Sequence, residues 1–334
     1  SKGYIWVGTQ NGLNRFDGYN FRIFTFDPSD TSSISNNWIY AITEDHQGNL
    51  WIGTKGGLNR WIYKENRFQR IKYATGFTHD VTDFPYDVKL ASDGSILVNT
   101  PPVLSVYNLK TNTFKHLTTE LPYDGAVKDN RIPLLEARDG RIWIGSTRGL
   151  SCFDPRSGKF RNFIHQAGQP GSISDNTITA LYEDTGGAIW IGTTSGLNRY
   201  DPGTMTFRKF YSDARNRQSL SSNFIRAITG DSAGYLWIGT EGGGLHRALW
   251  KDDRLVMENF TSETHGLGHN IIQDLLIDRS ENLWIGTLQG LCKTDLKPRK
   301  FHLYRRDDSH FSTDLLGNVV ASVYKDTKGK VWAG

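Results

Sequence analysis

The chain lacks the features that define several large classes of protein. It has only two cysteines, Cys152 and Cys292, in 334 residues, which excludes a disulfide framework as the main source of its stability. No run of about 18 apolar residues is present, and no charged-then-apolar leader opens the chain. We therefore expect no direct insertion of this chain into a membrane.

Strong charge and catalytic motifs are also missing. The formal net charge is only +4, and the lysines and arginines are scattered rather than gathered in runs, so nucleic acid is not an expected partner. The sequence contains no HExxH, no GxSxG, no glycine-rich phosphate loop and no EF-hand loop. We expect a domain that is not an enzyme and that needs no cofactor or metal.

What the chain does contain is glycine, with 35 residues, and aromatic side chains, with ten tryptophans among them. Most of these tryptophans belong to one phrase, LWIGTKGGLNRW at 50–61, which recurs at 5–16, 142–153, 189–200 and 283–294. The tryptophan position of the phrase is spaced by 45 to 48 residues along the whole chain. It is occupied by Trp6, Trp51, Leu97, Trp143, Trp190, Trp237, Trp284 and Trp332. A fixed period of this length indicates a repeat architecture.

Each period contains four short runs that suit strands. An apolar run ending in acid, such as IYAITED (39–45), is followed by a turn such as DHQG (45–48), the LWIGT strand, the GLNR strand and an aromatic strand such as MTFRKFY (205–211). Four strands per period predict one antiparallel propeller blade, and seven intervals predict an all-β, seven-bladed β-propeller. An eight-bladed ring is the structural alternative.

The position of each repeated residue predicts its role. We expect the tryptophans to fill the gaps between blades, and the glycine of WIG to lie where a neighbouring backbone comes close. The periodic acids Asp45, Asp184, Asp231, Asp278 and Asp326 are expected to form turns rather than to catalyse.

Both ends of the chain fall inside a repeat. The chain opens at a second strand, so we expect the strand around Val319–Lys325 to supply the missing innermost strand of the first blade and close the ring. Residues 1–334 are predicted to form a single propeller domain. Because the final VWAG repeats a strand that the first blade already has, we also expect the chain to be part of a longer protein.

One copy of the phrase departs from the rest. ILVNTPPVLSVY at 96–107 has Leu97 for tryptophan, Asn99 for glycine, and Pro101-Pro102 in the turn. The register is kept, so this blade is predicted to form with a looser wedge and a stiffer turn. The change is interpreted either as tolerated drift or as a contact surface for another domain or subunit.

The phrase LWIGTxxGLNRYD, with linkers such as SISNN (33–37), SISDN (172–176) and SLSSN (219–223), resembles the two-component regulator propeller repeat over essentially the whole chain. The resemblance implies the periplasmic sensor region of a hybrid two-component histidine kinase of gut bacteria, anchored in the inner membrane. It further implies a second propeller in the same chain and a carbohydrate breakdown product, monosaccharide or oligosaccharide, as ligand. A homodimer stays open, and no ligand-contacting residue can be carried over from the repeat.

Candidate ligand residues are therefore sought where the repeats differ. In a propeller, the linkers between blades and the TxxG turns share one mouth, and a sugar site needs aromatic faces with polar or cationic partners. The residues that fit are Asn37, Trp38, Lys55, Arg148, Arg215, Arg217, His265 and His269. The alternative is that these are ordinary solvated loop residues. A metal site at the histidine pair is not expected, because Gly266 and Gly268 disfavour a helix and no carboxylates cluster there.

Three functions are consistent with this sequence. The first is an extracytoplasmic sensor that binds a carbohydrate, or helps a second propeller to bind it. A protein-interaction scaffold and a polysaccharide lyase or hydrolase are the alternatives.

Overall fold

The structure is a computed structural model that describes residues 3–72, 84–119, 121, 132–297, 323–325 and 331–333. It divides into two compact units, Ser1–Thr294 and Asp295–Gly334, each of which is described by itself. Nearly all regular structure of the described residues is strand, and α1 (Ser262–His265) is a single helical turn. The all-β class is confirmed, whereas the single-domain boundary 1–334 stays a prediction.

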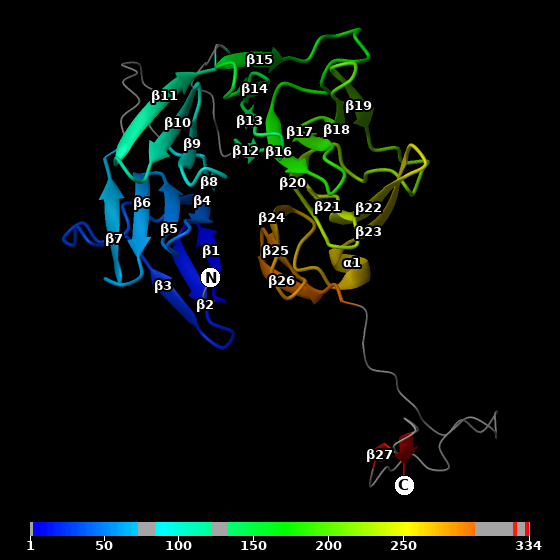
Figure 1. The fold of residues 1–334 in the computed structure, drawn as a ribbon. Helices are drawn as coiled ribbons and strands as arrows, with labels where there is room; N and C mark the ends of the chain where they lie inside the picture. Colours follow the sequence, from blue (N-terminus) through cyan, green and yellow to red (C-terminus); the bar gives the residue numbers. More distant parts are fainter. Residues whose placement is uncertain are drawn as a thin grey trace. The chain divides into compact units, whose positions relative to one another are not determined.

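The first unit consists of seven antiparallel sheets arranged as the blades of a ring (Figure 1). Blades 2 to 6 have four strands in chain order, and blades 1 and 7 have three each within the described residues. Inner strands of neighbouring blades contact one another around the ring. The seven-bladed β-propeller predicted from the repeat is confirmed.

The strands fall into four concentric sets. The innermost strands are β4 (Ile39–Glu44), β8 (Asp87–Leu90), β12 (Leu134–Glu136), β16 (Ile178–Glu183), β20 (Ile225–Gly230) and β24 (Ile272–Ile277). The second strands are β1 (Ile5–Thr9), β5 (Leu50–Thr54), β9 (Ile96–Thr100), β13 (Ile142–Gly145), β17 (Ile189–Thr193), β21 (Leu236–Thr240) and β25 (Asn282–Thr287). The third strands are β2 (Gly12–Phe16), β6 (Gly57–Ile62), β10 (Val103–Asn108), β14 (Leu150–Asp154), β18 (Gly196–Asp201), β22 (Leu245–Lys251) and β26 (Gly290–Asp295). The outermost strands are β3 (Phe21–Phe24), β7 (Arg67–Ile71), β11 (Thr113–Thr118), β15 (Lys159–Phe163), β19 (Thr206–Phe210) and β23 (Arg254–Phe260).

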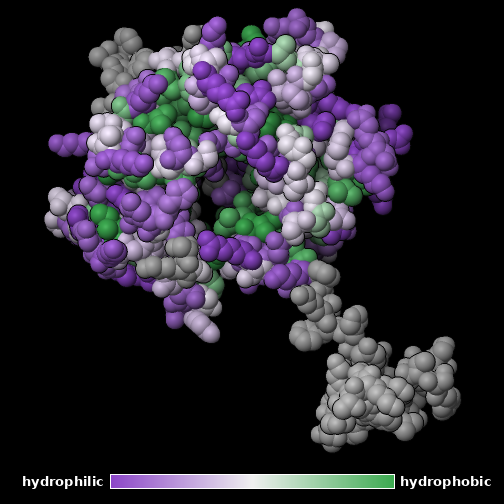
Figure 2. All heavy atoms as spheres, viewed as in Figure 1, coloured by the Kyte–Doolittle hydropathy of each residue, from purple (hydrophilic) through white to green (hydrophobic). Residues whose placement is uncertain are grey.

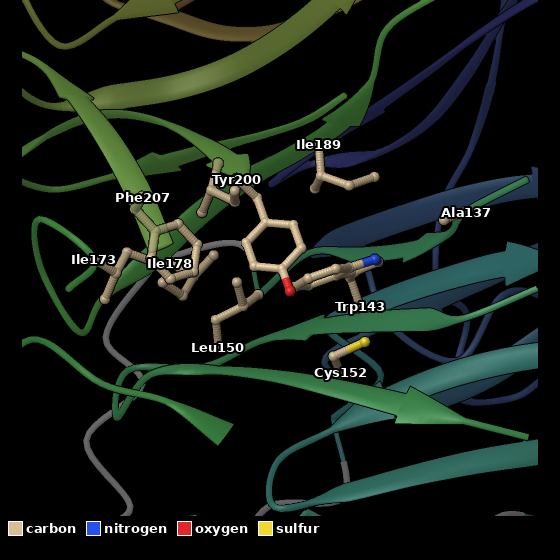
Figure 3. Packing of buried hydrophobic residues seen from close by; sticks show 10 residues of the cluster. Ala137, Trp143, Leu150, Cys152, Ile173, Ile178, Ile189, Tyr200 and Phe207 are labelled. Atoms are coloured by element: carbon tan, nitrogen blue, oxygen red, sulfur yellow. The ribbon is translucent and has the colours of Figure 1, made fainter. Parts of the chain in front are cut away.

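The repeated tryptophans form the core between blades. Trp143 of blade 4 is fully buried against Ile178, Ile189 and Tyr200 of blade 5, and its ring centroid lies 4.9 Å from that of Tyr200 (Figure 3). Burying a side chain of this size stabilises the fold by roughly 1.5–3 kcal/mol. The predicted wedge role of the tryptophans is confirmed.

The glycine of the WIG motif permits this close packing. A Cβ placed on Gly192 would lie 2.7 Å from Ile225 Cγ2 of the next blade, and one on Gly8 would lie 2.7 Å from Ile39 Cγ2. A larger residue at these two positions would collide with the next blade. The glycine lies where the next blade comes close, as predicted, but the close atoms here belong to an isoleucine side chain. At Gly53 the close atom is a backbone atom of the next blade, because a Cβ there would collide with the Pro85 carbonyl oxygen.

An aspartate fixes the wedge tryptophan in four blades. In blade 6, the Asp231 carboxylate accepts the backbone N–H groups of Ala233 (3.1 Å) and Tyr235 (2.9 Å), and also the Trp237 indole N–H (2.9 Å). The same indole bond recurs at Asp45–Trp51, Asp184–Trp190 and Asp278–Trp284, at 3.0, 2.8 and 2.8 Å. A hydrogen bond to a charged group contributes about 1.5–3 kcal/mol. These aspartates form turns, as predicted, and they also orient the core tryptophan.

Blade 3 forms in spite of its altered sequence. Its strands β8 to β11 pair in the usual order, and Leu97 is buried in place of tryptophan. Asn99, which replaces the glycine, reaches into blade 4, where its amide donates to the carbonyls of Ile132 (3.1 Å) and Gly145 (3.3 Å). The side chain that takes the space of the glycine therefore bonds to the neighbouring backbone.

The second unit contains one hairpin among its described residues. Strand β27 (Val323–Lys325) pairs with β28 (Val331–Ala333), with Tyr324 opposite Trp332. Tyr182 and Trp190 of blade 5 are paired in the same way, so this hairpin has the pairing of the first two strands of a repeat. The rest of the strand around Val319–Lys325 lies outside the described residues, and ring closure by it stays a prediction.

The two cysteines, Cys152 and Cys292, are both free thiols.

Blade 4 lacks the aspartate, because Ala137 takes its place and the buried Trp143 indole N–H has no acceptor among the described residues. Ala137→Asp should supply that acceptor and raise the free energy of unfolding by about 1 kcal/mol. Urea denaturation measures the change, with Ala180→Asp, a buried strand position without an orphaned donor, as the destabilising control. A less stable Ala137→Asp protein would contradict the role given to this hydrogen bond.

The hydrogen bonds of these aspartates also predict how the stability of the fold changes in acid. Burial raises the pKa of Asp278, but bonds from Trp284 and Asn282 outweigh it and lower the pKa from 3.8 to about 2. A lowered carboxyl pKa stabilises the fold above pH 4, and this contribution is lost as the pH falls towards 2. Asp278→Asn should therefore lose stability less steeply than the wild type in denaturation series between pH 5 and 2.5. Equal slopes would refute the assignment.

Candidate functional site

The linkers and the turns between second and third strands meet at one mouth of the central channel. In four blades, the residue just before the innermost strand accepts a backbone hydrogen bond from the residue after the threonine of WIGT. The pairs are Trp38–Lys55 (3.0 Å), Thr177–Thr194 (3.2 Å), Phe224–Glu241 (2.9 Å) and Ile271–Leu288 (3.1 Å). The predicted arrangement of linkers and TxxG turns is confirmed at these four blades.

A β-bulge interrupts the innermost strand of the same four blades at this mouth. The pairing register shifts between Ile39 and Ala41 of β4, and at the matching place in β16, β20 and β24. The extra residues are Tyr40, Thr179, Arg226 and Gln273. Bulges redirect a side chain and are frequent beside functional sites.

Three positions per blade therefore vary on a constant frame, and we name them the mouth triplets. Each consists of the last linker residue, the bulge residue and the first turn residue. The triplets are Trp38, Tyr40 and Lys55 in blade 2, Thr177, Thr179 and Thr194 in blade 5, Phe224, Arg226 and Glu241 in blade 6, and Ile271, Gln273 and Leu288 in blade 7. A hollow lies near the centre of the ring, and both hydrophilic and hydrophobic residues lie beside it (Figure 2).

The blade 2 triplet begins an aromatic cluster. The half-buried Trp38 ring lies 6.4 Å from Tyr40, which lies 5.1 Å from Tyr86 and 6.2 Å from Phe84 of blade 3. The Lys55 ammonium lies 5.6 Å from the centroid of Trp38, a cation–π contact worth about 0.5–1 kcal/mol at an exposed site. Trp38 and Lys55 are the two predicted site residues that this structure brings together.

The blade 6 triplet pairs its charges internally. The Arg226 guanidinium forms an ion pair with Glu241, donates to the Gln273 amide oxygen of blade 7 (2.9 Å) and lies 5.1 Å from the Phe224 centroid. Thr179 of blade 5 likewise donates to the Ile225 carbonyl of blade 6. The bulge residues thus connect neighbouring blades around the mouth.

Polar anchors hold the linkers above the third strands. In blade 5, the Asn198 amide accepts the Ser174 N–H (2.9 Å) and donates to the Ser174 hydroxyl (2.8 Å), and Asn59 does the same for Ser35 in blade 2. In blade 6 a histidine takes this position, and His246 Nε2 accepts the Ser221 N–H (3.1 Å). Burial lowers the pKa of His246 from 6.5 to about 4, so the ring is neutral at pH 7.

Asn37 has a repeated structural role. Its side-chain oxygen accepts the backbone N–H of Phe26 (2.7 Å), which fixes the start of the linker. The matching residues Asn176, Asn223 and Asn270 accept equivalent backbone bonds at 2.6, 2.7 and 2.8 Å. Asn37 therefore belongs to the frame of the mouth.

The remaining predicted residues lie in other blades. Arg148 is in the blade 4 turn, where its N–H donates to Ser146 Oγ (3.0 Å), and Arg215 and Arg217 are exposed on the linker before blade 6. His265 ends α1 with its ring 4.8 Å from Phe260, and His269 Nδ1 accepts the Ile271 N–H (2.9 Å). No metal-binding group of three His, Cys, Asp or Glu residues occurs among the described residues.

Tyr40, Arg226 and Gln273 were not predicted from the sequence. Their signal is visible in it, because the residue after the first isoleucine of the innermost strand changes from blade to blade while that isoleucine is constant. The four pairs are Ile39-Tyr40, Ile178-Thr179, Ile225-Arg226 and Ile272-Gln273. A strand pattern alone does not reveal that this residue is a bulge.

A second hollow lies between blades 1 and 7. It has a volume of about 690 Å³, and its walls include Ile5, Phe16, Trp284 and Leu291. Leu291 is 36% exposed, whereas its counterparts Leu58 and Leu197 are buried. The cleft borders blade 1, whose innermost strand is not among the described residues. It therefore carries no proposal of a ligand site.

Comparison with known proteins relates the chain to parts of bacterial two-component systems. Residues 33–56, 172–195, 219–242 and 266–289 match the two component regulator propeller family. The extracellular domain of a hybrid two-component system from B. thetaiotaomicron is 26% identical with a TM-score of 0.71, covering 100% of this chain and 44% of that one. A second such domain from the same organism is 25% identical with a TM-score of 0.66, covering 100% and 42%.

A histidine kinase of Formosa agariphila, called Histidine kinase P4, is 54% identical over 33 residues, which is 10% of this chain and 2% of that protein. The chain thus spans less than half of the two solved domains and a small fraction of the kinase. Within the described residues, no helix has the length and apolar character needed to cross a bilayer.

The blade 6 anchor predicts a pH-dependent stability. Because the pKa of His246 is lower in the folded chain than in the unfolded chain, stability should fall as the pH drops from about 6.5 to 4. His246→Asn, which restores the residue found at Asn59 and Asn198, should flatten this part of the stability curve and leave stability at pH 8 within about 1 kcal/mol. A variant with the same slope as the wild type in thermal denaturation would contradict the interpretation.

Proposed function

We propose that this chain, which is built from two-component regulator propeller repeats, is an extracytoplasmic sensor domain that binds a carbohydrate at the mouth of its central channel. The similarity to extracellular domains of hybrid two-component systems extends over the full chain and supports the sensor class. A periplasmic location, with the longer protein anchored in the inner membrane, belongs to the same proposal.

The aromatic cluster of blades 2 and 3 carries the proposal. Sugar rings bind proteins by stacking an apolar face on aromatic side chains, with polar groups nearby for the hydroxyls. Trp38 and Tyr40 are half-buried at the mouth, and Tyr86 lies 5.1 Å from Tyr40 across the gap between blades. The Lys55 ammonium adds a hydrogen-bond donor on the same blade.

The mouth also offers a route for a signal. Tyr40 contacts Tyr86 of blade 3, and Arg226 bonds to Gln273 of blade 7, so a ligand that moves a bulge residue also affects the next blade. Interfaces between packed, rigid elements convert small displacements into discrete rigid-body changes. In our proposal, this change passes to a second propeller and a membrane helix of the longer protein, and from there to a histidine kinase.

Calorimetry of the 334-residue chain against a panel of glycan oligosaccharides tests the proposal. Trp38→Ala should weaken binding of the recognised glycan at least tenfold, or about 1.4 kcal/mol, because the stacking face is lost. Tyr19→Ala is the control, since Tyr19 is 92% exposed in the turn between β2 and β3 of blade 1 and should bind as the wild type does.

Two outcomes would favour other functions. Turnover of a glycan would refute a sensor-only role and favour a lyase or hydrolase. Absence of binding to the whole panel, by this chain and by the longer protein, would favour a protein-interaction scaffold. Binding by the longer protein alone would place the site outside this propeller.

A further inference from the structure

Two mouth triplets contain a cation beside an aromatic ring, and they differ in one respect. In blade 6, Arg226 lies over Phe224 and is neutralised by Glu241 of the same triplet. In blade 2, Lys55 lies over Trp38, and the third member is the uncharged Tyr40. Lys55 forms no ion pair within residues 3–72, 84–119 and 132–297. The blade 2 triplet thus has a cation without an internal anion.

Asp87 and Asp45, two acidic residues of blades 3 and 2, do not form an ion pair with Lys55. On blade 3, the Asp87 carboxylate accepts the N–H groups of Val88 (2.9 Å) and Leu134 (2.8 Å) and lies 3.9 Å from Lys89. On blade 2 itself, the Asp45 carboxylate is engaged by Trp51 and Arg60 at the other end of the sheet. The carboxylates of Asp87 and Asp45 are therefore engaged by other groups.

The Trp38 indole alone holds the Lys55 ammonium weakly. A cation–π contact at an exposed site is weaker than a hydrogen bond between an ammonium and an anion. An anion bound beside the half-buried indole would meet a lysine that forms no ion pair with any carboxylate of the described residues.

We propose that the carbohydrate bound at this mouth is anionic, a uronic acid or a sulfated sugar, with its ring against Trp38 and Tyr40 and its carboxylate or sulfate on Lys55. This inference rests on the proposed function and adds the chemical class of the ligand. In blade 6, by contrast, the cation Arg226 is already paired with Glu241 of its own triplet.

Calorimetry with three disaccharide probes tests the class: one containing glucuronic acid, one carrying a sulfate, and a neutral one of the same linkage. The wild type should bind one of the anionic probes at least tenfold more tightly than the neutral probe. Lys55→Gln should remove this preference, and Lys55→Arg should keep it. Lys64→Gln, an exposed position in the β6–β7 turn at the opposite end of the same blade, is the charge-matched control and should bind as the wild type.

A gain-of-binding variant tests the same logic in blade 6. Glu241→Gln leaves Arg226 without its anion, so this variant should bind the anionic probe at one additional, weaker site. Its thermal denaturation, compared with that of the wild type, shows whether the fold is kept.

The failures of the two proposals are distinguishable. Binding of a neutral glycan that Trp38→Ala abolishes and Lys55→Gln does not alter would overturn the anionic class and leave the carbohydrate sensor standing. Binding of no glycan by the wild type would overturn both. A preference for anionic probes that survives in Lys55→Gln would refute the assignment of the charge to Lys55.

Discussion

The hydrogen bond between an aspartate and an indole is the interaction that organises four of the seven blades. It joins the turn after the innermost strand to the tryptophan that fills the gap to the next blade, so one carboxylate fixes a hairpin and a blade contact together. The glycine two residues after the tryptophan lets the next blade approach, because a Cβ at Gly192 would collide with Ile225. A single blade is stable only when it packs against its neighbours, and these two contacts fix the spacing between blades.

The hydrogen bonds that repeat from blade to blade form a constant frame, and this frame leaves the residues of the mouth triplets free to vary. The linker anchors and the backbone bond between linker and turn repeat with little change, whereas the mouth triplets range from three threonines in blade 5 to two aromatic residues and a lysine in blade 2. The bulge is the device that connects the two, because it turns one residue of an otherwise regular strand out of the ladder. Scaffold and candidate recognition surface therefore occupy different positions of the same repeat.

The sequence predicts the scaffold well because its signals are local and repeated. The Trp spacing, the Asp-to-Gly turns and the WIG glycine recur in most copies of the repeat, and blade count and strand order follow from them. The candidate site follows less directly from the sequence: the structure brings Trp38 and Lys55 together, and it shows that the Asn37 side-chain oxygen accepts the backbone N–H of Phe26. Tyr40 and Arg226 were missed because a bulge depends on pairing across strands, which strand periodicity does not reveal. The sequence shows only that Asn99 replaces the glycine. The hydrogen bond from its side-chain amide to the backbone of blade 4 is visible only in three dimensions.

The central claim is that the repeat supplies the fold and that the mouth triplet of blade 2 supplies recognition. Exchanging that triplet for the one in blade 5, by Trp38→Thr, Tyr40→Thr and Lys55→Thr together, tests it most directly in a single calorimetric titration with the recognised glycan. The account predicts a protein that unfolds at nearly the wild-type temperature and no longer binds the glycan. Retained binding by this triple variant would contradict the claim.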